Sequence, residues 1–178
     1  MEVSVFVGTS VDGFLAREDG ALDFLPAESE EHGYEAFIAS VDVIVIGRNT
    51  YDTVLRFPEW PYGSKPVVVL SGRPIPAPPA ADAVVELMSG EPRDVVARLA
   101  ERGAGHLYVD GGITVQGFLR AGLVTRLVIT RVPVLIGGGI PLFGPLPRDV
   151  RLQHVATRQY PSGLVQSEYR VAVGPGAP

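Results

Sequence analysis

The stretch Val43-Ile44-Val45-Ile46-Gly47-Arg48-Asn49-Thr50-Tyr51 joins four consecutive β-branched apolar residues to the start of a helical pattern. Four such residues in a row are typical of a strand that is buried on both faces, as in a parallel sheet. A helix start exposes unpaired backbone N–H groups and the positive end of the helix dipole, so it favours an anion. Arg48 adds a planar donor fork suited to phosphate, and Thr50 adds a hydroxyl. The stretch predicts a strand leading into a phosphate-binding helix start; Arg48 as a solvated first-turn residue fits the pattern equally well.

Strand and helix patterns alternate on either side of this stretch. The expected strands are residues 2–8, 41–47, 66–70, 83–87 and 106–109, and the expected helices are residues 30–40, 49–55, 92–102 and 115–121. Such alternation predicts an α/β fold with a mostly parallel central sheet and helices on both faces. The segments 152–160 and 164–173 have no helix between them, so they predict an antiparallel hairpin at the edge of the sheet. We expect one domain over residues 1–173 and a flexible tail over residues 174–178.

The composition narrows the classes of function. Of 178 residues, 46% are hydrophobic and 20% are charged, which suits a full core, and the net charge of -5 comes without a basic cluster that could bind nucleic acid. The absence of cysteine excludes thiolate nucleophiles and cysteine-ligated metals, and the three histidines lie far apart in sequence. We therefore expect no metal site. No apolar run reaches membrane-spanning length and strand-like sequence begins at Glu2, so the expected location is the cytoplasm.

Two further strand ends carry residues suited to anions. The carboxyl ends of parallel strands meet at one edge of the sheet, and here Ser71 and Arg73 follow one strand while Asp110-Gly111-Gly112-Ile113-Thr114 follows another. The two glycines allow close approach of phosphates to a helix start, with Thr114 in its first turn. Two helix starts and two arginines predict a ligand with several phosphates, for which NADPH is the natural candidate. The alternatives are a tight turn at the glycines, an ordinary loop charge at Arg73, and for Asp110 either a site acid or a helix cap.

Five segments, taken in order, resemble the dihydrofolate-reductase fold. The resemblance is stronger to its branch similar to the reductase domain of bacterial riboflavin biosynthesis, and it covers almost the whole chain. The segments are Ser10-Val11-Asp12-Gly13-Phe14-Leu15-Ala16, Gly47-Arg48-Asn49-Thr50-Tyr51, Val69-Leu70-Ser71, Val109-Asp110-Gly111-Gly112 and Pro133-Val134-Leu135-Ile136-Gly137-Gly138-Gly139-Ile140-Pro141-Leu142-Phe143.

The resemblance implies an NADPH-dependent reductase. It places Gly47, Arg48 and Thr50 at cofactor phosphates, Ser71 and Arg73 near the adenosine 2′-phosphate, and Gly111, Gly112, Ile113 and Thr114 around the pyrophosphate. The loop over residues 10–20 would close over the nicotinamide and the substrate. In that branch the substrate is an aminopyrimidine that bears a ribose phosphate, reduced in its ribosyl carbonyl form. Members of the family are often dimers, so a homodimer is expected.

Two other functions remain open. Leu25-Pro26-Ala27-Glu28 resembles the dihydrofolate reductase motif that holds the substrate-binding acid, so Glu28 is a candidate for that acid or else a helix-capping residue. Against folate, Gly63-Ser64-Lys65 stands where those reductases carry an arginine for the folate glutamate. Asp12 would either contact substrate or shape the Asp-Gly turn. The last alternative is a non-catalytic NADPH-binding module, against which the intact loop over residues 10–16 speaks.

Overall fold

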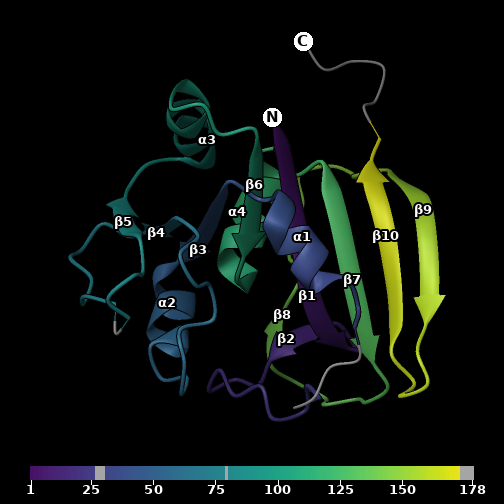
Figure 1. Ribbon diagram of the computed structural model, residues 1–178. Helices are drawn as coiled ribbons and strands as arrows, with labels where there is room; N and C mark the ends of the chain where they lie inside the picture. The colour runs from purple at the N-terminus through teal and green to yellow at the C-terminus, as the bar shows by residue number, and fades with distance from the viewer. Residues whose placement is uncertain (27–30, 79, 173–178) are drawn as a thin grey trace.

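A single large sheet organises the chain. The computed structural model describes residues 1–26, 31–78 and 80–172. Its eight-stranded sheet has the order β5-β4-β3-β6-β1-β7-β10-β9 (Figure 1). Neighbouring strands from β5 to β7 are parallel, whereas β10 is antiparallel to both β7 and β9. The strands are β1 (Glu2–Ser10), β3 (Val43–Gly47), β4 (Val67–Leu70), β5 (Val85–Met88), β6 (His106–Asp110), β7 (Arg126–Val132), β9 (Leu152–Gln159) and β10 (Val165–Val171). The expected α/β fold with an antiparallel edge is confirmed.

Helices cover both faces of the sheet. On one face, α1 (Tyr34–Ser40) and α2 (Arg48–Val54) pack on the cluster that includes Phe6, and on the other, α3 (Pro92–Glu101) and α4 (Gly112–Arg120) pack on Val3, Val5 and Val7. Successive side chains of a strand point to opposite faces, so β1 supplies both cores in alternation. None of these described helices is long and apolar enough to cross a membrane.

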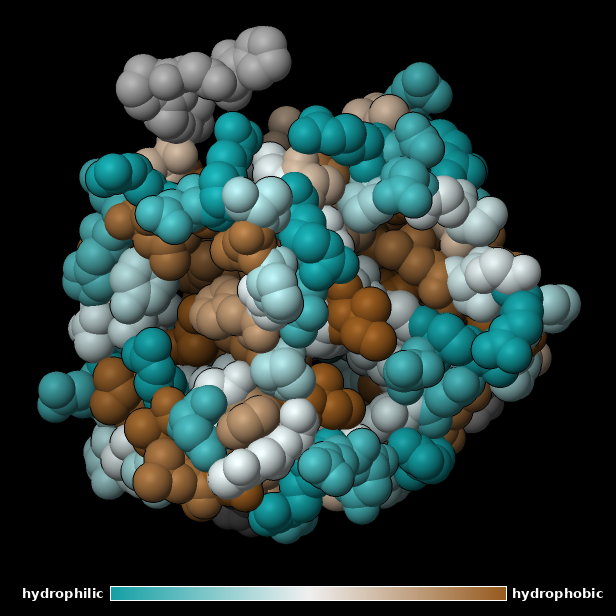
Figure 2. All heavy atoms as spheres, turned by 180° about the vertical axis from the view of Figure 1, so that it is seen from behind, coloured by the Kyte–Doolittle hydropathy of each residue, from teal (hydrophilic) through white to brown (hydrophobic). Residues whose placement is uncertain are grey.

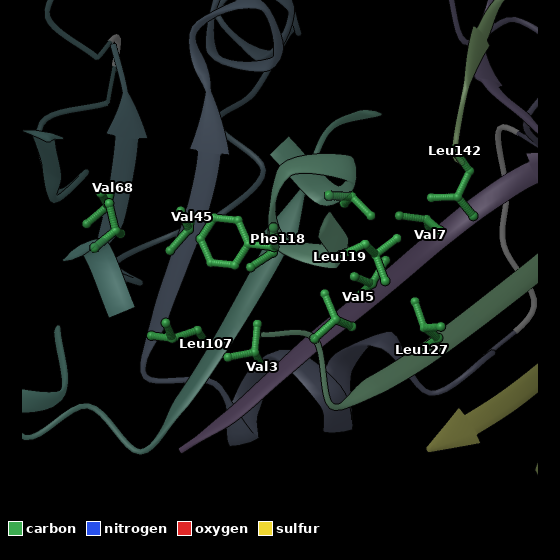
Figure 3. Packing of buried hydrophobic residues seen from close by; sticks show 14 of the residues in the cluster. Val3, Val5, Val7, Val45, Val68, Leu107, Phe118, Leu119, Leu127 and Leu142 are labelled. Carbon is green, nitrogen blue, oxygen red and sulfur yellow. The ribbon is translucent and has the colours of Figure 1, made fainter. Parts of the chain in front are cut away.

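The core under α4 fixes the position of that helix. Phe118 is fully buried and lies beside Val45 of β3, with Leu119 above Val5 of β1 (Figure 3). Truncating a buried phenylalanine to alanine typically costs about 3–5 kcal/mol, so this contact holds α4 firmly on the sheet. The start of α4 is consequently fixed at the carboxyl end of β6.

The structure departs from the expected elements at three places. The helix expected from residue 30 begins at Tyr34, after Gly33 in a left-handed conformation with φ 86°. The helix expected from Val115 begins earlier, at Gly112. A small sheet of β2 (Phe14–Ala16) and β8 (Ile140–Pro141) was not expected, because strands this short carry too few residues for a periodic pattern.

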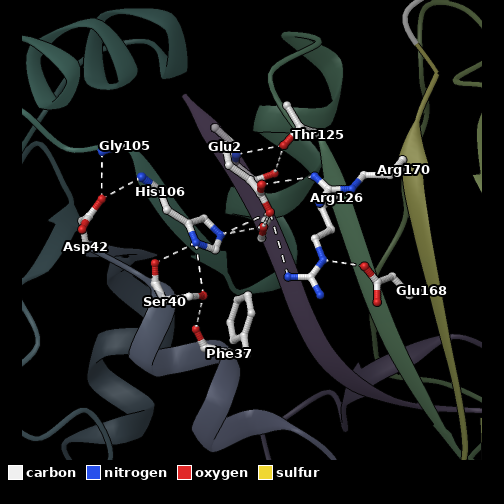
Figure 4. A network of polar contacts seen from close by, with 12 residues as sticks. Glu2, Phe37, Ser40, Asp42, Gly105, His106, Thr125, Arg126, Glu168 and Arg170 are labelled. Atoms are coloured by element: carbon white, nitrogen blue, oxygen red, sulfur yellow. Dashed lines mark hydrogen bonds and ion pairs between the residues drawn. The ribbon is translucent and has the colours of Figure 1, made fainter. Parts of the chain in front are cut away.

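A polar network closes the opposite end of the sheet, where the parallel strands begin (Figure 4). The Glu2 carboxylate contacts Arg170 at 3.2 Å and Arg126 at 3.9 Å, and Arg126 also pairs with Glu168 on β10 at 2.8 Å. Burial raises the pKa of Glu2, but the interactions with Arg170 and its neighbours outweigh burial and leave the pKa below its usual range. His106 contacts the Ser4 hydroxyl at 2.8 Å within the same network. The network therefore ties β1, β6, β7 and β10 together at the end of the sheet where the parallel strands begin.

Candidate active site

A cleft of about 1060 Å³ opens at the carboxyl ends of the parallel strands. The starts of α2 and α4 line one part of it, and β1, the segment after β2 and three tyrosines line another. Seven of the nine residues predicted to bind the cofactor line this cleft: Gly47, Arg48, Thr50, Gly111, Gly112, Ile113 and Thr114. The molecular surface seen from behind is hollowed in several places, where hydrophobic side chains are exposed between hydrophilic ones (Figure 2).

Reciprocal contacts between glycine and threonine bring the two helix starts together. A Cβ atom at Gly47 would lie 2.6 Å from the Thr114 hydroxyl, and one at Gly111 would collide with the Thr50 hydroxyl. Each helix start therefore has a glycine against which the threonine of the other helix packs. Gly111 also has φ 92°, a left-handed conformation that favours glycine. Gly111, which the sequence predicted to allow close approach of a ligand, is also needed, with Gly47, for the close approach of the two helices.

Both helix starts present backbone N–H groups to the cleft. Among the residues that the structure describes, no side chain caps either α2 or α4 at its first turn. The side chain of Ile113, in the first turn of α4, lines the cleft although 72% of the residue is exposed. An anion with an apolar portion would satisfy the N–H groups and cover this side chain.

Arg48 connects the start of α2 to the segment after β4. Its Nε donates to the Asp52 carboxylate at 2.9 Å, and its Nη1 donates to the Pro74 carbonyl at 2.8 Å. The Tyr51 hydroxyl donates to the Pro76 carbonyl at 2.8 Å and fixes the same segment. The guanidinium is therefore more than a solvated first-turn charge, because it holds residues 74–76 against α2.

We expect Arg48→Ala to lower the free energy of unfolding by about 1–2 kcal/mol, because one ion pair and one hydrogen bond to a carbonyl are lost. Arg56→Ala is the matched control: Arg56 is exposed and donates to Thr53 at 3.3 Å, so its loss should cost less than about 0.5 kcal/mol. Urea denaturation of both variants measures the difference. Equal losses would show that the contacts of Arg48 carry no stability.

Ser71 and Arg73 are not among the residues that line the cleft. They follow Leu70, which does line it, and form a tight turn in which the Ser71 hydroxyl donates to the Arg73 carbonyl at 2.9 Å and accepts from the Arg73 N–H at 3.1 Å. The Arg73 side chain is exposed beside the segment that Arg48 holds. Their assignment to the 2′-phosphate stays a prediction.

Asp110 lies among three tyrosines that also line the cleft. Burial raises the pKa of Asp110, while hydrogen bonds from the Gly111 N–H, at 2.7 Å, and from the Tyr108 side chain oppose the increase only in part. Burial and the nearby Asp110 charge raise the pKa of Tyr34 to about 12 and hold those of Tyr62 and Tyr108 well above the usual range. Tyr34 and Tyr108 were not predicted as site residues, although Tyr108 and Asp110 are two apart on one strand and so share a face.

Of the two predicted catalytic acids, the structure describes Asp12 but not Glu28. The Asp12 carboxylate accepts hydrogen bonds from the Gly137 N–H at 2.8 Å and the Ile136 N–H at 3.3 Å. The Ser10 hydroxyl, with these two N–H groups, keeps the pKa of Asp12 below its usual range, so the group is ionised and shapes the loop. Asp12 is not among the residues that line the cleft, and a catalytic role for it stays a prediction. Glu28 lies outside the described residues.

The segment after β2 forms part of the wall of the cleft. Gly20, Leu22 and Leu25 line the cleft, and a Cβ atom at Gly20 would lie 3.6 Å from the Thr53 hydroxyl on α2. The Arg17–Asp23 ion pair, at 2.6 Å, closes the base of this segment. We call residues 17–26, which follow β2, the lid segment.

The fold is that of dihydrofolate reductase. The structure of dihydrofolate reductase from Enterococcus faecalis, complexed with NADP(H), superposes with a TM-score of 0.65 over 96% of each chain, at 15% sequence identity. The chain also matches the model of the RibD C-terminal domain over residues 2–166. It belongs to the RibD C-terminal domain family, a family of reductases, as the sequence resemblance predicted.

Two relatives match along nearly their whole length. A crystal structure of a "Putative riboflavin biosynthesis protein" from Shewanella sp. PV-4 is 40% identical and has a TM-score of 0.89, covering 97% of this chain and 99% of that one. The uncharacterized protein YwjB of Bacillus subtilis is 32% identical over 160 residues, which is 88% of this chain and 90% of that protein. The structural likeness to the Shewanella protein therefore spans nearly the whole of both chains.

Proposed function

We propose that this protein is an NADPH-dependent reductase that transfers a hydride to a small organic substrate. The observation that carries the proposal is the pair of facing, uncapped helix starts within one cleft that also holds a half-buried acid, Asp110. A dinucleotide has phosphates for two such starts and a flat ring for the rest of the cleft. NADPH, when bound, supplies the hydride.

The residues at the helix starts suit the cofactor. The backbone N–H groups of Gly112, Ile113 and Thr114 begin α4 and would hold the pyrophosphate, with Thr50 and Arg48 at the start of α2 beside them. Close packing of Thr50 on Gly111 brings these donors to one place before any ligand binds. Donors that are fixed in advance lose little entropy on binding, which raises affinity.

Asp110 is our candidate for the acid that completes the reduction. A carbonyl or imine that gains a hydride also needs a proton on its oxygen or nitrogen. Burial favours the protonated form of Asp110, so the carboxyl can hold a proton near the cleft above the usual range of an aspartate. The lid segment covers this region with Leu22 and Leu25, which would exclude water from the reacting atoms.

Calorimetric titration tests the cofactor. We expect NADPH to bind at least tenfold more tightly than NADH, and Arg73→Ala to remove about 1.4 kcal/mol of that preference by deleting the charge nearest the proposed 2′-phosphate position. Arg56→Ala serves as the control, with the preference retained. Equal affinity for NADPH and NADH in the wild-type protein would contradict the assignment of Arg73, and binding of neither would contradict the reductase.

A non-catalytic NADPH-binding module would share the cofactor site. The lid segment and Asp110 argue for chemistry, since neither is needed to hold a dinucleotide. Oxidation of bound NADPH by any pterin, flavin-precursor or carbonyl compound, followed by absorbance, separates the two functions. Dihydrofolate reduction gains no support at Lys65, whose ammonium donates to the carbonyls of Val41 at 2.6 Å and Ala39 at 3.3 Å beside the end of α1.

A further inference from the structure

We propose that the substrate is a planar heterocycle without a phosphate group, neutral or protonated, which lies among the tyrosines beside Asp110. The proposal rests on the proposed reductase function and names the class of substrate for the same cleft. It departs from the phosphorylated aminopyrimidine that the family resemblance implies. Three properties of the cleft carry it: its aromatic lining, the positions of its cations and the charge of the lid segment.

The lining of this part of the cleft is aromatic. Phe6, Tyr34, Tyr62 and Tyr108 all contribute to it, and Phe6 and Tyr34 lie edge to face with ring centroids 5.6 Å apart. The parts of these side chains that reach the cleft give it an aromatic surface against which a planar ring can pack. The Asp110 carboxyl beside them accepts an N–H from such a ring, or donates to it when protonated.

The cations among the described residues that line the cleft do not belong to its aromatic part. Among the described residues that line the cleft, Arg48 and Arg120 are the cations. Arg48 is turned towards Asp52 and the Pro74 carbonyl. Arg120 is the last residue of α4, eight residues beyond Gly112, and an α-helix of that length rises about 12 Å. The Arg48 guanidinium is held by these contacts, and Arg120 lies at the far end of α4 from Asp110.

The charge of the lid segment disfavours an anionic substrate. The described residues 17–26 contain one cation, Arg17, which pairs with Asp23, and three acidic residues, Glu18, Asp19 and Asp23, so this segment carries a net negative charge. Like charges within about 8 Å repel at physiological salt, and a buried anion without a partner is strongly disfavoured. A neutral ring or a protonated one meets no such penalty here.

One cation stands at the rim and makes the proposal testable. The Arg56 guanidinium donates to the Thr53 hydroxyl at 3.3 Å, and its Nη2 would lie 3.9 Å from a Cβ atom at Gly20. Thr53 and Gly20 both line the cleft. Arg56 is the cation that a phosphate extending from a ring past Gly20 and Thr53 would meet, so this side chain can separate the two classes of substrate.

The test is a calorimetric titration of the protein with ribose 5-phosphate, and with 5-amino-6-ribosylaminouracil and its 5′-phosphate as a matched pair. Each titration is run on the protein alone and on the protein saturated with NADP⁺. We expect no saturable binding of ribose 5-phosphate up to about 10 mM, and a phosphate that gives the ring compound no gain in affinity. Arg56→Ala should leave every result unchanged.

Two results would contradict the proposed class of substrate. Binding of ribose 5-phosphate below about 1 mM, or a phosphorylated ring compound that binds at least tenfold more tightly and loses this advantage in Arg56→Ala, would overturn the proposal. Failure of NADP⁺ to bind would overturn the reductase instead, and the titrations of the protein alone would still decide the substrate class. The two proposals can therefore fail separately.

Discussion

Replacing Gly111 by alanine should lower the free energy of unfolding by about 3 kcal/mol and weaken NADPH binding at least tenfold. Two costs add: an L-residue in the left-handed region costs about 1–2 kcal/mol, and an inserted methyl that meets packed atoms costs about 1–3 kcal/mol. Here φ is 92° and the methyl would collide with the Thr50 hydroxyl. The start of α4 must move away from α2, which separates the backbone donors of the proposed cofactor site.

Gly103→Ala is the matched control for this variant. Gly103 has φ 89°, close to that of Gly111, but nothing lies within 4 Å of the position of its Cβ atom. It should therefore show the conformational cost alone, with NADPH affinity unchanged. Adding Thr50→Ala to Gly111→Ala should recover the packing cost and leave the conformational one. Urea denaturation and calorimetry of the cycle check this, and equal losses at Gly103 and Gly111 would disprove the packing role.

Asp110→Asn should lower kcat by about 10²–10⁴-fold while NADPH affinity stays within about twofold. Asparagine keeps an oxygen that can accept the Gly111 N–H, so the start of α4 retains its local contact. It cannot supply a proton. If the wild-type protein is the proposed reductase, its kcat should fall as pH rises through the raised pKa of Asp110, and this decline should be absent from the variant. A variant with wild-type kcat would remove Asp110 from the chemistry.

Asp110 also makes stability depend on pH, and the sign follows from the direction of the pKa shift. Because burial raises its pKa above the ordinary value of 3.8, the folded protein binds this proton more tightly than the unfolded chain. The contribution of Asp110 to the free energy of unfolding is fully present below pH 3.8, and it is lost as pH rises through the pKa of Asp110 in the folded protein. Denaturation at several pH values should show the wild-type protein losing stability relative to Asp110→Asn over that window. A constant difference would show that burial does not perturb the group.

The fold was predictable from sequence because its strands and helices carry strong patterns. The run Val43–Ile46 and the alternation of Val3, Val5 and Val7 specify buried strands, and Pro92 marks the start of α3. What the sequence could not indicate was β2 and β8, whose pairing depends on the closeness of Gly139 to the Ala16 carbonyl. That contact joins residues far apart in the chain and leaves no periodic signal.

The sequence predicted those site residues that directly follow the ends of strands. It did not predict how side chains from distant parts of the chain come together. Gly47, Thr50, Gly111 and Thr114 come together because parallel strands end at one edge. Their reciprocal packing, however, is a property of two helices in three dimensions. Tyr34 and Tyr62 belong to segments separated in sequence, so only the folded chain brings them to Asp110.

The central place of the first strand has a consequence for how the chain folds. In β1, Glu2 pairs with His106 and Ser4 pairs with Arg126, so each neighbour of this strand comes from more than a hundred residues later. Closing such long loops is entropically costly and slows folding. On the ribosome, the amino-terminal strand must wait for most of the chain to emerge before it has partners. Its apolar face, which carries Val3, Val5 and Val7, is then the surface that a chaperone would have to shield during synthesis.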